Sequence, residues 1–205
     1  MIFQTWTPQS DRILEVPAEG GPPAEITEPA EGDAGYADLS PDGLRIAFVV
    51  AEGNAERVFI RARGGGAARP LTSAPSSVPR WSPDGRWIAF ARDRRLDGGV
   101  FLVRPDGTEE RRLTDTGGWP VWWPDGSKVA FRAIGEDGNQ EIRLVAVSGG
   151  SPERLPGIRF AGNNLPIDVS RDGRLLATTN EVESWSEIWL LKPSRGDEER
   201  TAPSR

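Results

Sequence analysis

One short segment, built around Asp-Gly, recurs four times along the chain, and this repetition constrains the fold more than any other feature of the sequence. The four copies read LSPDGLRIAF, WSPDGRWIAF, WWPDGSKVAF and VSRDGRLLAT. Their aspartates are 42, 41 and 47 residues apart: Asp42, Asp84, Asp125 and Asp172. A constant period of about 20 to 50 residues is the sequence signature of a repeat architecture, in which each unit is one supersecondary structure.

Two further landmarks keep the register of these repeats. Apolar runs follow the four aspartates by 16, 16, 17 and 16 residues, beginning at Val58, Val100, Ile142 and Ile188. Thirteen residues after each of these positions come Leu71, Leu113, Leu155 and Thr201. Ile13 and Ile26 continue the same spacing toward the N-terminus. We therefore expect the chain to begin inside a repeat, after its Asp-Gly turn, and to contain four full repeats and one partial repeat.

Each repeat is predicted to form four short antiparallel strands. In Ser-Pro-Asp-Gly, the proline presets φ at the second turn position and the glycine occupies the fourth, which favours a type I turn between the first two strands. The apolar run forms the third strand and the Leu-Thr segment the outer edge. Such small sheets bury their faces only by stacking on neighbours, and radial stacking gives a β-propeller. Trp81 and Trp122 occupy a repeat position where a large apolar group would lie between blades.

The fold class expected is therefore all-β, a β-propeller of four-stranded blades. A single domain would span residues 1–205, with a partial blade at 1–30 and blades at about 36–72, 78–114, 119–155 and 166–202. We expect an incomplete ring, because the first repeat lacks its innermost strand. Two hypotheses follow: the sequence is a segment of a longer chain with more blades, or it stands alone and closes imperfectly or associates with another copy.

The composition excludes several kinds of chemistry. The chain has no histidine and no cysteine, which excludes histidine general bases, thiol nucleophiles, disulfides, and zinc or haem sites that need these ligands. Its net charge of -6 argues against a nucleic acid or an anionic membrane surface as the partner. No apolar run is long enough for membrane insertion. We expect a cytoplasmic protein if Met1 is the native start, and a periplasmic or extracellular one if the chain is a fragment.

The segments PRWSPDGRWIAFAR and VFLVRPDGTEERRLT resemble the repeat of TolB-like β-propellers, which is related to the repeat in the propeller domains of prolyl-oligopeptidase-like peptidases. The resemblance covers nearly the whole chain. It implies a protein-binding platform, as TolB is within a cell-envelope complex, or a gate over a hydrolase active site. Three positions depart from the repeat: Trp123 replaces a serine, Arg171 a proline and Thr201 the outer-strand leucine. The Gly-x-Ser-x-Gly elbow of the hydrolase relatives does not occur in this sequence.

The first strand of each blade is expected to line the central channel. Two residues before each Ser-Pro-like step, this strand carries Asp38, Arg80, Val121 and Asp168. Such a mixed ring would hold a partner's peptide or a small polar ligand; the alternative is that these side chains are simply solvated. The aspartates of the Asp-Gly turns are assigned a structural role instead, because a group repeated in every blade is what folding needs and catalysis does not.

The longest interval between turns contains PGIRFAGNNL, at residues 156–165. A loop exposing Arg159, Phe160, Asn163 and Asn164 is a candidate recognition element, since binding residues concentrate in loops on a rigid scaffold; the alternative is a tolerated insertion. The acidic segment 136–141 lacks the alternating ligand spacing of an EF-hand, so no metal site is expected there. No cofactor and no catalytic residue is assigned.

Together these observations favour a non-catalytic protein-binding scaffold whose partner is a protein or peptide, with self-association left open. The alternative is the substrate-gating propeller of a prolyl-oligopeptidase-like serine peptidase whose catalytic domain lies outside this sequence. The chain would then be part of an enzyme without holding a catalytic residue itself. A third hypothesis, a carbohydrate lyase or metal-assisted lyase built on a propeller, is disfavoured by the absence of histidine.

Overall fold

The computed structural model describes residues 2–5, 12–17, 19–26, 34–92, 98–156, 167–182 and 185–191, and the regular elements within them are all β-strands. This part of the chain contains no helix able to span a membrane. Three sheets have four strands: β4 (Ala34–Leu39), β5 (Arg45–Glu52), β6 (Ala55–Ala62) and β7 (Arg69–Pro70); β8 (Ser77–Trp81), β9 (Ile88–Ala91), β10 (Val100–Val103) and β11 (Arg111–Arg112); β12 (Gly118–Trp122), β13 (Lys128–Ile134), β14 (Gln140–Ala146) and β15 (Glu153–Arg154). Two sheets have three described strands: β1 (Ile2–Thr5), β2 (Arg12–Glu15) and β3 (Ala24–Glu25); β16 (Ile167–Val169), β17 (Leu176–Val182) and β18 (Trp185–Leu191).

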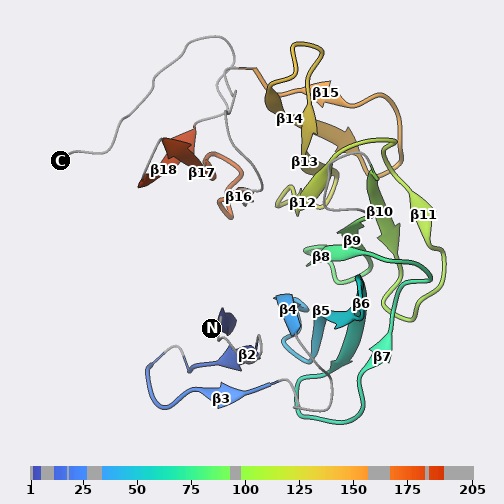
Figure 1. Cartoon of the computed structure of the whole chain (residues 1–205), viewed down its shortest axis with the longest axis vertical. Coiled ribbons are helices and arrows are strands. Elements are labelled where there is room, and N and C mark those ends of the chain that lie inside the picture. The colour runs from blue at the N-terminus through green and yellow to red at the C-terminus, as the bar shows by residue number, and fades with distance from the viewer. Residues whose placement is uncertain are drawn as a thin grey trace.

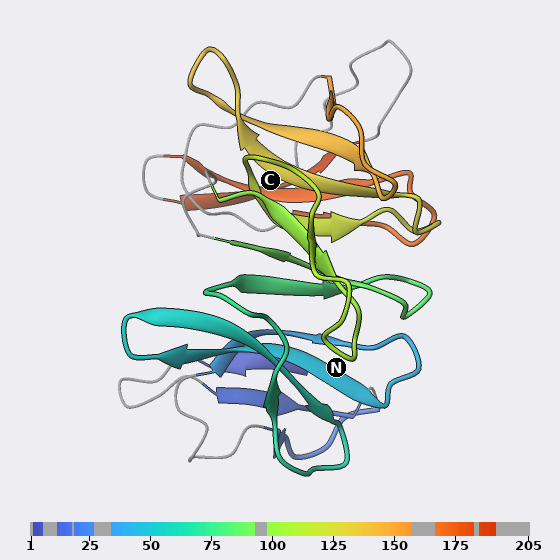
Figure 2. The same cartoon turned by 90° about the vertical axis from the view of Figure 1, so that its right-hand side faces the viewer.

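These sheets are arranged around a common axis, with β4, β8, β12 and β16 toward the centre (Figure 1). We number as first to fourth blades the sheets that begin with these four strands, and call β1–β3 the partial blade. A side view shows the blades stacked one on another (Figure 2). The expected all-β propeller of four-stranded blades is confirmed. Its ring is incomplete: among the described strands, none pairs the partial blade with the fourth blade.

The thirteen-residue spacing seen in the sequence corresponds to a backbone hydrogen bond. The N–H of Leu71 donates to the carbonyl of Val58 at 2.8 Å, directly after the two-residue outer strand β7. The same bond, also at 2.8 Å, joins Leu113 to Val100, Leu155 to Ile142, and Ile26 to Ile13. The spacing is therefore constant because it sets the pairing of the fourth strand with the third.

The Ser-Pro-Asp-Gly turns are closed by side-chain hydrogen bonds. In the first blade, the Ser40 hydroxyl accepts the N–H of Arg45 at 2.9 Å, and the Asp42 carboxylate accepts the N–H of Leu44 at 2.9 Å. Hydrogen bonds from the Ser40 hydroxyl and the Leu44 N–H hold the pKa of Asp42 below its usual value. The turns of the second and fourth blades repeat these bonds, so the turn aspartates have the local role expected of them.

The third blade keeps its turn although Trp123 replaces the serine. Ser127 supplies the missing hydroxyl, because its Oγ and its N–H donate to the Asp125 carboxylate at 2.7 and 2.8 Å. The Trp123 indole is half-buried and lies beside the next turn, where a Cβ on Gly173 would meet Trp123 Nε1 at 3.3 Å and Pro124 Cδ at 3.7 Å. The turns of adjacent blades thus contact one another at this end of the propeller.

Neighbouring blades share their apolar cores. Trp81 is 5% exposed and packs in one cluster with Ile60 and Leu71 of the first blade. Trp122 packs in the same way with Leu102 of the second blade. Both tryptophans therefore lie between blades, as the sequence predicts. Since each buried Å² of apolar surface contributes about 25 cal/mol, these shared cores stabilise the packing of one blade against the next.

Three first strands carry a β-bulge at the same position. The bulged residues are Tyr36, Val78 and Trp119, with φ of 51°, 53° and 55°, and the pairing register shifts directly after each of them. A positive φ is unusual for any residue with a side chain, and for a β-branched valine it is an outlier. The Tyr36 and Trp119 rings meet edge to face, with centroids 5.6 Å apart, in one cluster with Val78. This cluster joins the first strands of three consecutive blades.

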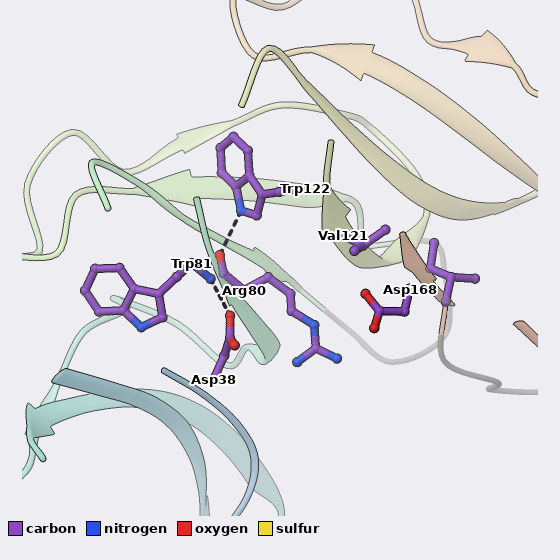
Figure 3. Close-up of a pocket in the computed structure, with 7 residues that line it drawn as sticks. Asp38, Arg80, Trp81, Val121, Trp122 and Asp168 are labelled. Atoms are coloured by element: carbon purple, nitrogen blue, oxygen red, sulfur yellow. Dashed lines mark hydrogen bonds between the residues drawn. The ribbon is translucent and has the colours of Figure 1, made fainter. Parts of the chain in front are cut away.

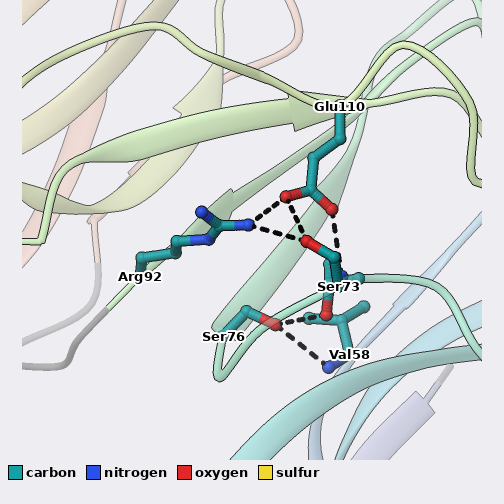
Figure 4. Close-up of polar contacts among 6 residues, drawn as sticks. Val58, Ser73, Ser76, Arg92 and Glu110 are labelled. Atoms are coloured by element: carbon teal, nitrogen blue, oxygen red, sulfur yellow. Dashed lines mark hydrogen bonds and ion pairs between the residues drawn. The ribbon is translucent and has the colours of Figure 1, made fainter.

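Polar contacts fasten the connection between the first and second blades (Figure 4). The Glu110 carboxylate accepts the N–H and the hydroxyl of Ser73 at 3.1 and 3.0 Å and forms an ion pair with Arg92. In the same connection, the Ser76 hydroxyl accepts the N–H of Val58 at 3.3 Å. The segment that links β7 to β8 is therefore fixed to both of the blades that it joins.

We predict that Gly117→Ala strongly destabilises the protein. Gly117 has φ +96°, and a Cβ there would lie 2.6 Å from the carbonyl oxygen of Arg132. The control is Gly138→Ala, where φ is +76° but nothing lies within 4 Å, so only the backbone cost remains. Denaturant unfolding should show Gly117→Ala to be less stable than the control by about 1–3 kcal/mol. Equal losses of stability in the two variants would contradict the close approach of Gly117 to the carbonyl of Arg132.

Candidate functional site

Four equivalent residues of the first strands line one cavity near the axis of the propeller. Asp38 of β4, Arg80 of β8, Val121 of β12 and Asp168 of β16 all contribute to this cavity of about 490 Å³. Trp81, Trp122 and Ile167 complete its walls (Figure 3). The structure therefore brings together the four ring residues that the sequence places at one repeat position.

The Asp38 carboxylate bridges the first and second blades. One of its oxygens accepts the N–H of Trp81 at 2.7 Å, and the other accepts the N–H of Leu39 at 3.1 Å. Burial raises the pKa of Asp38; the positive charge of Arg80 and the two hydrogen bonds oppose this, and the negative charge of Asp168 adds to it. Both carboxylate oxygens of Asp38 are thus already bonded to the backbone.

Arg80 is half-buried, and its guanidinium lies in the space between Asp38 and Asp168 (Figure 3). Its backbone carbonyl accepts the indole N–H of Trp122 at 2.9 Å, which ties the second blade to the third. Its guanidinium makes one long hydrogen bond, to the carbonyl of Pro79 at 3.4 Å. No carboxylate in the described ranges forms an ion pair with Arg80.

Asp168 is exposed and leaves one carboxylate oxygen free of hydrogen bonds to the described residues. The other oxygen, Oδ1, accepts the N–H of Val169 at 2.8 Å. Val121 and Ile167 are buried beside it and give the cavity an apolar wall. A charged group that enters the cavity is therefore partly shielded from water, which strengthens any hydrogen bond it makes there.

This arrangement suits noncovalent recognition. It presents one guanidinium and one free carboxylate oxygen beside apolar walls, and its described lining holds no nucleophile paired with a base. The described residues also contain no group of three or more acidic side chains placed to hold a metal ion. The chemistry available to these residues is the binding of a polar group by hydrogen bonds and charge.

Sequence reasoning missed part of this lining. It placed Trp81 and Trp122 only between blades, whereas both also line the cavity, and it did not single out Ile167. The signal was available, since each of the three adjoins a ring residue in the chain. The other candidate site residues, Arg159, Phe160, Asn163 and Asn164, lie outside the described residues, so their recognition role stays a prediction.

The sheets and their repeated turns define a β-propeller with a cavity near its axis. Residues 36–204 match the family model of the TolB beta propeller domain, and the chain belongs to this family. The expected resemblance is confirmed.

Two curated relatives and one solved structure illustrate the similarity. The chain is 36% identical over 172 residues to the uncharacterized peptidase YuxL of Bacillus subtilis, covering 77% of this chain and 26% of YuxL. It is 34% identical over 116 residues to a TolB homolog of Chlorobium luteolum, covering 55% of this chain and 26% of that protein. The crystal structure of TolB from Acinetobacter baumannii superposes with a TM-score of 0.80 at 15% identity, over 94% of this chain and 48% of that one. The chain thus spans about a quarter of the length of these two curated relatives.

We predict that Asp38→Asn gains stability relative to the wild type as the pH rises. The prediction concerns this change with pH, because the amide replaces one of the two acceptor oxygens by an N–H donor and loses a hydrogen bond at every pH. Because the folded-state pKa of Asp38 is raised, folding favours its protonated form. The protonated Asp38 side chain therefore stabilises the folded wild type below about pH 4, and this stabilisation is lost as the pH rises through the raised pKa. Thermal melts should show the melting temperature of Asp38→Asn rising relative to that of the wild type from about pH 4 to about pH 7.

Asp42→Asn is the matched control, because its stability relative to the wild type should change with pH in the opposite direction. The pKa of Asp42 is lowered in the folded protein, so its stabilisation is present above about pH 4 and disappears as the pH falls through the lowered value. This variant should be less stable than the wild type at neutral pH. If the melting temperatures of both variants, measured relative to the wild type, change with pH in the same direction, the burial of Asp38 does not have the effect inferred here.

Proposed function

We propose that this chain is a non-catalytic binding module that captures a partner protein at the mouth of its channel. The observation that carries the proposal is Arg80, a half-buried cation inside a cavity with no ion-pair partner among the described residues. Some arginines elsewhere in these blades form ion pairs, as Arg92 does with Glu110 and Arg143 with Glu141. A guanidinium kept unpaired in a partly apolar cavity is costly for folding, which supports a role in binding.

The charge of the chain supports a protein partner over other kinds. A net charge of -6 disfavours nucleic acid and anionic membranes. A second copy of the chain remains a candidate partner. The similarity to TolB, a component of a cell-envelope complex, supports a compartment outside the cytoplasm, and we propose the periplasm or the cell surface rather than the cytoplasm.

The similarity to the peptidase YuxL supports a second candidate function, the propeller of a serine peptidase. In that role the channel would filter peptides on their way to a catalytic domain. This sequence has no histidine, so the catalytic base would have to come from residues outside it. Binding at the channel mouth is common to both functions, and the presence of a catalytic domain in the native protein distinguishes them.

We predict that Arg80→Gln reduces partner capture at least about tenfold. Glutamine is preferable to glutamate here, because a third carboxylate beside Asp38 and Asp168 would be destabilising. The tagged protein is used to purify partners from its source cells, with quantitative mass spectrometry as the readout. The control is Arg86→Gln, an exposed residue in the turn of the same blade. The proposal fails if Arg80→Gln retains the partners, or if the control loses them equally while both variants keep the wild-type melting temperature.

For the peptidase alternative, we predict no labelling of the native protein by a fluorophosphonate, which reacts with activated serines. The native protein is recovered from source cells with an antibody, its intact mass is measured, and the probe is applied. A mass well above 22.3 kDa together with labelling would establish the peptidase and overturn the purely non-catalytic role. Absence of labelling at any mass supports the binding module.

A further inference from the structure

The donors of Arg80 indicate which chemical group the cavity accepts. A guanidinium carries five N–H donors in a planar fork, and one of them is used, in a long bond of 3.4 Å to Pro79. Asp38 lines the same cavity from the neighbouring blade, and its two carboxylate oxygens accept the backbone N–H groups of Trp81 and Leu39. Arg80 therefore keeps donors for a group that comes from outside the described residues.

A carboxylate matches these donors better than other anions do. Its two oxygens accept two parallel N–H bonds from one guanidinium, and such charge-assisted pairs are short and strong. Asp38 and Asp168 repel any anion in the cavity, but they repel a phosphate group more than a carboxylate, because phosphate carries close to two negative charges and a carboxylate one. The apolar walls formed by Val121 and Ile167 reduce competition from water.

Asp168 supplies a hydrogen-bond acceptor beside the donors of Arg80. Its free oxygen is an acceptor on the opposite side of the Arg80 guanidinium from Asp38 (Figure 3). In a peptide, a carboxylate lies within a few Å of backbone N–H donors, whether it is the C-terminal group or the side chain of aspartate or glutamate. A cavity of about 490 Å³ lies within the usual size of small-ligand sites, so it suits a short extended segment.

The geometry points to a peptide carboxylate as the group captured at the channel mouth, with Arg80 binding the carboxylate and Asp168 accepting an N–H of the same segment. This inference rests on the proposed binding function and narrows it to one class of ligand. The carboxylate comes from a C-terminus or from an acidic side chain, and the test separates these sources.

The indole N–H of Trp122 gives a local signal for the test, because it donates to the backbone carbonyl of Arg80 at 2.9 Å. The indole region of a ¹⁵N–¹H spectrum contains one signal for each of the 8 tryptophans, and Trp122→Phe identifies the one required. Four peptides are titrated into the full chain: Ac-Gly-Ala-Ala with a free C-terminus, and the amidated peptides Ac-Gly-Glu-Ala, Ac-Gly-Gln-Ala and Ac-Gly-phosphoSer-Ala.

We expect a saturable shift of the Trp122 signal with the free C-terminus or with the glutamate peptide, at a Kd of about 1 mM or lower, and none with the glutamine peptide. The more strongly bound of the two carboxylate peptides identifies the source. Arg80→Gln should weaken binding at least about tenfold, and Arg86→Gln should leave it unchanged. Asp168→Asn, which keeps an acceptor oxygen, should weaken binding less than Arg80→Gln does.

The inference is overturned if neither carboxylate peptide binds, if the glutamine or phosphoserine peptide binds as well as they do, or if Arg80→Gln binds with wild-type affinity. Its failure is distinguishable from failure of the proposed function. If Arg80→Gln loses the partner protein but no carboxylate peptide binds, the binding module stands and the ligand class is wrong. If Arg80→Gln keeps the partner protein, the proposed function itself is wrong.

Discussion

The packing of each blade against the next is the interaction on which the rest of this structure depends. A four-stranded sheet cannot bury both of its faces alone, so every blade shares its core with a neighbour. Trp81 and Trp122 are the largest side chains in these shared cores, and each lies between two blades. The same packing brings first strands that are about forty residues apart in sequence close together around the axis.

Hydrogen bonds between blades then fix the cavity. On the channel side, Asp38 accepts the N–H of Trp81 and the indole of Trp122 donates to the carbonyl of Arg80. On the outer side, Arg69 donates to the carbonyl of Pro105 at 2.7 Å, and Arg111 makes the equivalent bond to Val147 at 2.6 Å. These bonds join the first blade to the second and the second blade to the third at both edges, so the protein itself holds these walls of the cavity in place.

The fold does not by itself decide the function of this chain. The chain is similar both to TolB proteins and to an uncharacterized peptidase. What distinguishes one propeller from another is the set of side chains that the first strands present to the channel. Here that set is one arginine, two aspartates and apolar walls, a combination suited to binding a polar group.

The sequence by itself determined the all-β propeller, the closing of the turns and the positions that form the ring, because a constant period places equivalent residues at equivalent points of a stack. It did not reveal the bulges at Tyr36, Val78 and Trp119, because none of these residue types favours the positive φ that the bulge requires. Nor did it reveal that the Asp38 carboxylate accepts the N–H of Trp81, or that Arg80 forms no ion pair with the described residues. These features were decided by the tertiary structure, since they depend on the distance and rotation between blades, which the period of a repeat does not specify.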